Sequence, residues 1–124
     1  MLALATGAPG PTSANEDTID RSRALFVRLA DSPIMPIVEP ETDRIAGSLE
    51  MGLPARQLEL AASIGKLLAI DGDSPAVAIV DVVTGSVNRE SLGFVPRRLA
   101  VSPDGLTAAL ADTGNGRIAL LDLL

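Results

Sequence analysis

The sequence contains neither cysteine nor histidine among its 124 residues. Without cysteine, the chain can form neither a disulfide bond nor a cysteine-ligated zinc site. Without histidine, it lacks the commonest general base, the partner that activates serine and cysteine nucleophiles, and the usual nitrogen ligand of transition metals. Any catalysis would depend on Asp, Glu, Lys or Arg, and we expect no catalytic, cofactor-binding or metal-binding residue in this chain.

Aromatic residues are almost absent as well: Phe26 and Phe94 are the only two, and the chain has no Trp or Tyr. Single-stranded nucleic acids bind on stacked aromatic side chains, and the net charge of −6 opposes binding to phosphate backbones or anionic lipids. The sequence has no apolar run of about 18 residues, the length that a membrane-spanning helix needs. We therefore predict neither a nucleic-acid partner nor a membrane span.

Residues 1–22 differ in character from the rest. Gly7, Pro9 and Pro11 break any periodicity there, and Thr12-Ser13-Ala14 has the small-x-small pattern of a signal-peptidase site. We predict that residues 1–22 are a flexible leader or the remnant of a signal peptide that begins upstream.

From residue 23 onward, an internal repeat organises the chain. Asp31-Ser32-Pro33 recurs 42 positions later as Asp73-Ser74-Pro75, and a third, partial copy follows at a shift of 41. Further matches are Ile37-Val38-Glu39 with Ile79-Val80-Asp81, Pro54 and Arg56 with Pro96 and Arg98, and Asp71 with Asp112. Turn residues every eight to twelve positions or so indicate short strands. A period of roughly 40–45 residues with four short strands is typical of a β-propeller blade.

The turn residues also predict where the strands lie. Ser102-Pro103-Asp104-Gly105 has the composition of a tight turn, with Pro at its second position and Gly at its end. The strands expected around such turns are 76–82, 86–92, 97–101 (an inner strand), 106–111 and 117–123. The continuous apolar character of 76–80 suits a sheet that is covered on both faces.

Several of these segments resemble the YVTN-type β-propeller repeat family. The resemblance rests on Asp81-Val82-Val83-Thr84-Gly85, Val95-Pro96, Leu99-Ala100-Val101, Ser102-Pro103-Asp104-Gly105 and Leu110-Ala111-Asp112. It covers roughly residues 24–124 and is clearest from residue 70. It implies an all-β fold: an incomplete β-propeller of about two and a half four-stranded antiparallel blades over residues 23–124. It also implies a non-catalytic binding or scaffold module, without an identified ligand, in a periplasmic or secreted protein.

Alternative interpretations remain at this stage. Residues 54–70 have good helix formers at roughly helical spacing, which would predict a helix instead of a strand–turn–strand. The chain could be a fragment of a propeller enzyme, lactonase-like or amine-dehydrogenase-like, or a degenerate product without a function. Residues 16–19 and 24–27 also resemble the start of periplasmic zinc chaperones. Those proteins bind zinc largely through histidine, so their metal role transfers to no residue here.

The repeat register predicts an unfinished propeller. The repeats start at the second strand of one blade, near Ala24, and stop at the third strand of another. Closed propellers contain about four to eight blades. We therefore expect the end sheets to expose apolar faces, and the chain to associate with further propeller blades or with itself.

Two clusters of polar residues are candidate sites. Asp71-Gly72-Asp73-Ser74, with Asp81 nearby, suggests a calcium site because Ca²⁺ binds clustered carboxylates. The segment lacks the third spaced acid and the closing Glu of an EF-type loop, so a turn between strands explains it better. The same applies to Asp112-Thr113-Gly114-Asn115-Gly116, and we interpret Asp81 and Asp122 as turn-capping side chains.

The arginines are the third candidate. Arg97 and Arg98, with Arg89 upstream, could face an anion near the centre of a propeller. Charged residues on strands more often protect exposed strand ends, and we favour that interpretation. Ser102 is not a candidate nucleophile, because no histidine is available to activate it and its turn accounts for it.

Overall fold

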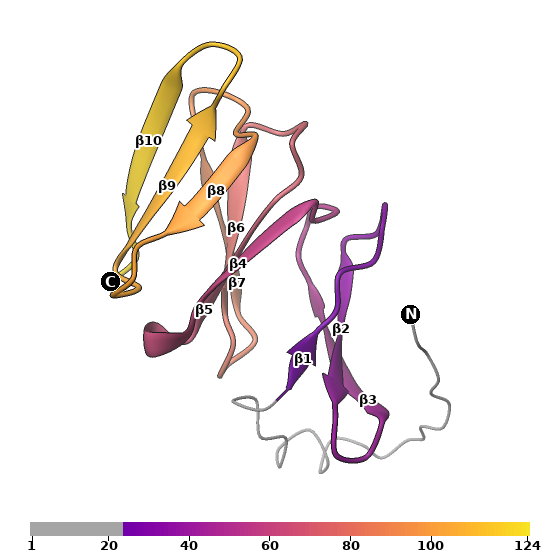
Figure 1. Ribbon diagram of the computed structural model, residues 1–124. Helices are drawn as coiled ribbons and strands as arrows, with labels where there is room; N and C mark the ends of the chain where they lie inside the picture. Colours follow the sequence, from indigo (N-terminus) through magenta and orange to yellow (C-terminus); the bar gives the residue numbers. More distant parts are fainter. Residues whose placement is uncertain (1–23) are drawn as a thin grey trace.

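The structure is a computed structural model that describes residues 24–124; the predicted leader, residues 1–22, lies outside the described residues. The described chain folds into three antiparallel sheets and one short 3-10 helix, η2 (Ala62–Ile64) (Figure 1). The predicted all-β class is confirmed. The strands are β1 (Leu25–Phe26), β2 (Ile34–Glu39), β3 (Arg44–Glu50), β4 (Gln57–Ala61), β5 (Lys66–Ile70), β6 (Ala76–Asp81), β7 (Val87–Ser91), β8 (Arg98–Val101), β9 (Thr107–Asp112) and β10 (Arg117–Asp122). Within this range no helix has the length and apolar character to cross a membrane.

Each sheet is a meander in which consecutive strands pair. The first sheet has the order β1-β2-β3, the second β4-β5-β6-β7, and the third β8-β9-β10. The sequence repeat relates them, because β6 is the repeat equivalent of β2, and β9 is the repeat equivalent of β5. The second sheet is therefore a complete four-stranded blade, the first sheet has the equivalents of strands two to four, and the third has those of strands one to three. This is the predicted partial propeller.

Residues 54–70 do not form the alternative helix. They form β4, η2 and β5, and Gly65 ends η2 in the left-handed conformation at φ 66°. β5 pairs with β4 on one side and with β6 on the other. Two ladders of main-chain hydrogen bonds and burial on both faces outweigh the helix propensity of the isolated segment.

A β-bulge corrects one detail of the predicted repeat. The pairing of β2 with β3 shifts between Ile37 and Val38. Ile37 pairs with Gly47 and Val38 pairs with Ile45, so Ala46 has no partner in β2. Val80 and Ile79 of the second sheet pair with the consecutive positions 87 and 88. The extra residue changes the repeat shift from 42 to 41 beyond that point. Arg56 is consequently equivalent to Arg97, and the sequence-based match of Arg56 with Arg98 is wrong by one position.

Main-chain hydrogen bonds verify this register. The amide of Arg56 donates to the carbonyl of Ile70 (2.7 Å), and the amide of Arg97 donates to the carbonyl of Ala111 (2.8 Å). Ile70 and Ala111 are themselves repeat equivalents, and each is the last apolar residue of its strand, so the two arginines precede β4 and β8 in the same way.

The central strands of the second sheet, β5 and β6, are buried on both faces, because the other two sheets pack against them. In β5, Leu67 and Ala69 belong to the core shared with the first sheet, whereas Leu68 and Ile70 belong to the core shared with the third. Successive side chains of a strand point to opposite faces, so an uninterrupted apolar strand serves two cores at once. Met35, Ile37, Leu49 and Met51 complete the first core, and Val77, Leu99, Ala108 and Leu110 complete the second.

The first strands of the second and third sheets lie side by side. β4 contacts β8 directly, and the side-chain amide of Gln57 donates to the carbonyl of Leu99 (2.8 Å). Beyond the other end of β4, the hydroxyl of Ser63 donates to the carbonyl of Asp104 (2.9 Å). These two bonds hold the strands that would lie innermost in a propeller.

Candidate functional site

The predicted calcium candidate is a turn. The carboxylate of Asp71, at the end of β5, accepts hydrogen bonds from the amides of Asp73 (2.8 Å) and Ser74 (2.7 Å) and from the Ser74 hydroxyl (2.7 Å). Burial alone would raise the pKa of Asp71, but these hydrogen bonds favour its charged form and together hold the pKa below its ordinary value. The oxygens that would bind a cation are occupied by the turn.

Asp112 has the equivalent role after β9. Its carboxylate accepts from the side-chain amide of Asn115 (2.8 Å), the amide of Gly114 (3.2 Å) and the guanidinium of Arg117 (3.3 Å). The bond from Asn115 is the largest influence that lowers the pKa of Asp112, and the Arg117 contact adds to it. Arg117 also lies over the ring of Phe94, 5.4 Å from its centroid, which fixes the hairpin against the preceding loop.

Asp81 caps the turn after β6, as predicted, because it accepts from the amides of Val83 (2.9 Å) and Thr84 (3.1 Å). Asp122 accepts one bond, from the amide of Leu124 (3.1 Å), and the structure has no turn at this place. Residues 24–124 contain no group of three or more acidic side chains that could hold a metal ion.

Ser102 is likewise a turn residue. Its hydroxyl donates to the carboxylate of Asp104 (2.6 Å) and accepts from the amide of Thr107 (3.1 Å). The turn is closed by the amide of Gly105, which donates to the Ser102 carbonyl (2.8 Å). The hydroxyl therefore stabilises the hairpin between β8 and β9.

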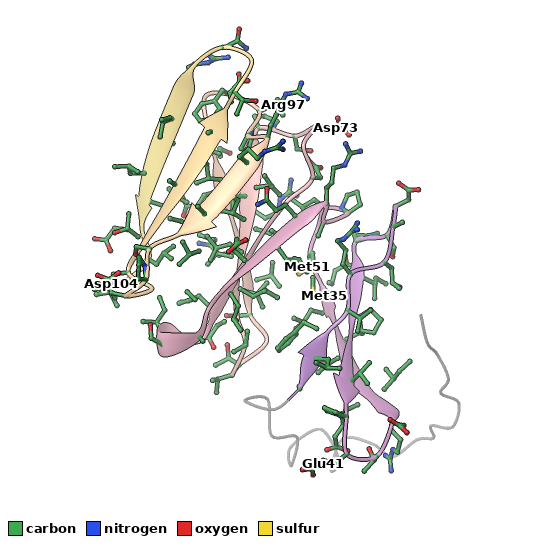
Figure 2. All side chains as sticks on the ribbon, in the orientation of Figure 1. Met35, Glu41, Met51, Asp73, Arg97 and Asp104 are labelled. Carbon is green, nitrogen blue, oxygen red and sulfur yellow. The ribbon has the colours of Figure 1, made fainter. Side chains whose placement is uncertain are left out.

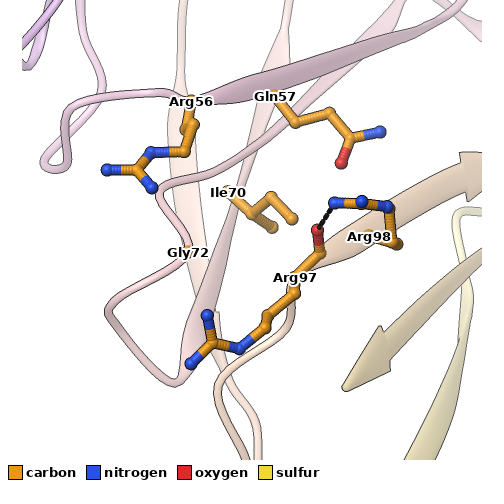
Figure 3. A pocket seen from close by; sticks show the side chains of 6 residues that line it. All are labelled: Arg56, Gln57, Ile70, Gly72, Arg97 and Arg98. Carbon is orange, nitrogen blue, oxygen red and sulfur yellow. Dashed lines mark hydrogen bonds between the residues drawn. The ribbon is translucent and has the colours of Figure 1, made fainter. Parts of the chain in front are cut away.

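Arginines from two sheets line a pocket of about 300 Å³. It lies where β4 and β8 begin and β5 ends, between the second and third sheets (Figure 3). The lining residues are Arg56, Gln57, Ile70, Gly72, Arg97 and Arg98. The sequence named Arg97 and Arg98 as arginines that could face an anion, and the structure adds Arg56. The equivalence of Arg56 and Arg97 depends on the bulge in the first sheet, which the sequence does not signal.

Arg89 does not belong to this group. It lies on β7, where its side chain passes over Gly52: a Cβ built at Gly52 would stand 3.1 Å from the Arg89 Cδ. Its role in the structure is to cover this connection between the first and second sheets.

The outer face of the third sheet carries an exposed apolar group, bordered on the same face by Arg98 and Asp122. In the ladder between β9 and β10, Ile118 pairs with Ala111 and Leu120 pairs with Ala109, so these four side chains share one face. Ile118 is 70% exposed and Leu120 is 71% exposed. We call this group, Ala109, Ala111, Ile118 and Leu120, the third-sheet end face.

The repeat relates this end face to a buried interface. Ile118 and Leu120 are the repeat equivalents of Val77 and Ile79, and Ala109 and Ala111 are those of Leu68 and Ile70. The four equivalents in the second sheet pack in the core shared with the third sheet. The third-sheet end face thus repeats, position for position, the surface on which one blade of this chain holds the next.

The first sheet has the complementary end face. Leu25 pairs with Val38, and Val38 pairs with Ile45, on the side away from the second sheet. Leu25 and Ile45 are both exposed. We call this group, Leu25, Pro36, Val38 and Ile45, the first-sheet end face. The repeat equivalents of Leu25, Pro36 and Val38 are Leu67, Ala78 and Val80, which pack toward the preceding sheet.

Comparisons with known proteins support the fold. No protein-family model and no curated protein sequence matches the chain. Among solved structures, the chain is similar to hydrazine synthase of Kuenenia stuttgartiensis, with a TM-score of 0.69 and 21% identity over 82% of this chain and 30% of that chain. It is also similar to the dihydro-heme d1 dehydrogenase NirN in complex with DHE, with a TM-score of 0.67 and 20% identity over 83% of this chain and 22% of that chain.

These similarities are to propeller proteins, and they agree with the three stacked sheets: the chain has the fold of a partial β-propeller. It spans less than a third of either solved chain that it matches. At about one fifth identity the likeness concerns the fold alone.

Proposed function

We propose that the chain is a non-catalytic binding or scaffold module of YVTN-like repeats that assembles with a second copy of itself. The third-sheet end face of one copy docks on the first-sheet end face of the next, in the way that the second sheet packs against its neighbours. Such a head-to-tail contact is heterologous, because it joins two different surfaces. Successive copies form a closed ring if the rotation from each copy to the next adds up to a full turn.

One observation carries this proposal: the exposed residues of the third-sheet end face are the repeat equivalents of residues that hold a neighbouring sheet. Ile118 and Leu120 replace Val77 and Ile79 by side chains of similar size, whereas Ala109 and Ala111 are smaller than their equivalents Leu68 and Ile70. Arg98 and Asp122 border this apolar group on the same face. Burying apolar surface contributes roughly 25 cal/mol per Å², so a few hundred Å² at each end supplies several kcal/mol. That is comparable with the whole stability of a small domain.

Sedimentation equilibrium of the full-length chain tests the proposal. We expect the apparent mass of the wild type to rise with concentration over the micromolar range, and Leu120→Lys to shift the protein toward the monomer. Val83→Lys is the matched control, because Val83 is 73% exposed but lies in the turn between β6 and β7, away from both end faces. It should associate like the wild type.

Two outcomes would reject the proposal. A monomer at high micromolar concentration with a cooperative thermal transition would mean that the end faces need no partner. Equal loss of association in Leu120→Lys and Val83→Lys would mean that added charge, and not the end face, controls association. Thermal melts of both variants show whether the fold is retained.

A second candidate function is a segment of a propeller enzyme. It is favoured by the two solved structures to which the chain is similar, one a synthase and the other a dehydrogenase, of which the chain spans 30% and 22%. Its catalytic residues would then lie in blades outside this sequence. The genomic sequence on either side of the reading frame separates the two candidates: further blades with histidines or clustered acids would favour the enzyme.

A further inference from the structure

We propose that the arginine-lined pocket between the second and third sheets binds a small anion with two or more carboxylate or phosphate groups. The proposal concerns a different part of the molecule from the end faces and does not depend on self-association.

The charge of the pocket is the first argument. Arg56, Arg97 and Arg98 line the pocket, and no carboxylate does. Arg98 pairs with Ala111 and so starts from the outer face of the third sheet, which leaves Arg56 and Arg97 as the guanidinium groups on which the proposal rests. This concentration of positive charge stands out in a chain whose net charge is −6. Like charges that share a pocket repel one another. A multivalent anion between them adds an attraction to each guanidinium group that outweighs this repulsion.

The second argument is that two of the three guanidinium groups have no partner in the described part of the chain. Neither the Arg56 nor the Arg97 side chain forms an ion pair or hydrogen bond with residues 24–124. Arg98 donates one bond, to the main-chain carbonyl of Arg97 (2.9 Å), which fixes its direction and leaves further N–H groups to donate. Two acids flank Gly72: the carboxylate of Asp71 is engaged by its own turn, and Asp73 is exposed and does not line the pocket.

The shape of the pocket is the third argument. Figure 3 shows Arg56 and Arg97 on opposite sides, with Ile70 between them. Ile70 is 1% exposed and gives the pocket an apolar base. A Cβ at Gly72 would stand 3.6 Å from the Arg56 Cδ, an ordinary van der Waals distance, so Gly72 and the Arg56 side chain lie next to each other at the edge of the pocket. A volume of about 300 Å³ matches the lower end of small-molecule sites.

These features define the ligand class. Guanidinium groups bind carboxylates and phosphates with paired, charge-assisted hydrogen bonds. Because Arg56 and Arg97 approach from opposite sides, an anion with acidic groups at two ends uses both, whereas a monovalent anion uses only one. The apolar base favours a carbon-containing body between these groups.

Isothermal titration calorimetry of the full-length chain with citrate, with inorganic pyrophosphate and with acetate, at constant ionic strength, tests the proposal. We expect citrate or pyrophosphate to bind and acetate to bind far more weakly. Arg97→Gln should weaken binding by about tenfold or more, because it removes a charge-assisted contact. Arg56→Gln should act in the same direction.

Arg44→Gln is the matched control, since Arg44 is exposed on β3 of the first sheet and the change in net charge is identical. Its affinity should equal that of the wild type. The proposal is overturned if neither citrate nor pyrophosphate binds, if acetate binds as well as they do, or if Arg44→Gln and Arg97→Gln weaken binding equally. Thermal melts in the absence of anion exclude misfolding of the variants, and repeating the titration with Leu120→Lys keeps the result separate from self-association.

Discussion

Ser63 and Asp104 join the second and third sheets: the hydroxyl of Ser63 donates to the main-chain carbonyl of Asp104 at 2.9 Å. The two residues lie one repeat apart and occupy equivalent turns of successive blades; Asp104 is labelled in Figure 2. The turn of one blade therefore contacts the turn of the next, and the neighbouring Gly105 is buried in this contact.

Gly105→Val should destabilise the protein much more than Thr107→Val. Gly105 has a φ of +77°, and a Cβ at this position would run into the Ser63 hydroxyl. The backbone strain alone costs about 1–3 kcal/mol. Thr107 is an exposed strand residue where a β-branched replacement changes stability by about 0.5 kcal/mol or less. Chemical denaturation of the two variants gives the comparison, and equal free energies of unfolding would contradict the assigned turn.

Asp71→Asn should lower stability at neutral pH by about 1 kcal/mol, since the charged acceptor of the turn becomes neutral. The folded-state pKa of Asp71 lies below its ordinary value of 3.8, so its contribution is fully present above that value. The contribution is lost as the pH falls through the lower, folded-state pKa. The stability difference between wild type and Asp71→Asn should therefore shrink below about pH 4.

Asp73→Asn is the control for that measurement, because Asp73 is exposed and its side chain makes no hydrogen bond within the described residues. Urea denaturation of the three proteins at neutral pH and at several acidic values measures the difference. A constant gap between wild type and Asp71→Asn down to the lowest pH would refute the role of the charged carboxylate.

Ile70→Ala and Ile118→Ala should differ strongly although they remove the same atoms. Ile70 is 1% exposed between two sheets, and a cavity there costs about 2–5 kcal/mol. Ile118 is 70% exposed in the single chain, so its truncation costs far less in the monomer. Denaturation at low protein concentration, where self-association is suppressed, isolates this difference. Similar losses of unfolding free energy in the two variants would mean that Ile70 is not buried between the second and third sheets.

The sequence predicted most of the fold because the repeat places turns and apolar strands in the same order each time. It predicted the turn 102–105 and the turn-capping role of Asp81 from local chemistry alone. It left residues 54–70 open between helix and strand, because the ladders that decide the outcome come from β6 and from the neighbouring sheets.

The arginine pocket shows what local patterns could not supply. Arg97 and Arg98 were visible as adjacent charges, but their relation to Arg56 depends on the unpaired Ala46 in β3, which no residue type signals. The pocket also needs β4 and β8 side by side, a contact between strands that belong to successive repeats. A bulge and a tertiary contact together assemble the candidate site.

Pairing of single cysteines tests the central claim, the head-to-tail docking of the two end faces, most directly. The chain has no cysteine, so Leu120→Cys and Ile45→Cys each carry one thiol, on the third-sheet and first-sheet end faces. The two variants, distinguished by a mass tag, are mixed and mildly oxidised, and the disulfide-linked dimers are counted by mass spectrometry. The account predicts that the mixed dimer exceeds both homodimers well beyond the statistical ratio; an excess of the Leu120→Cys homodimer, or a purely statistical distribution, would contradict it.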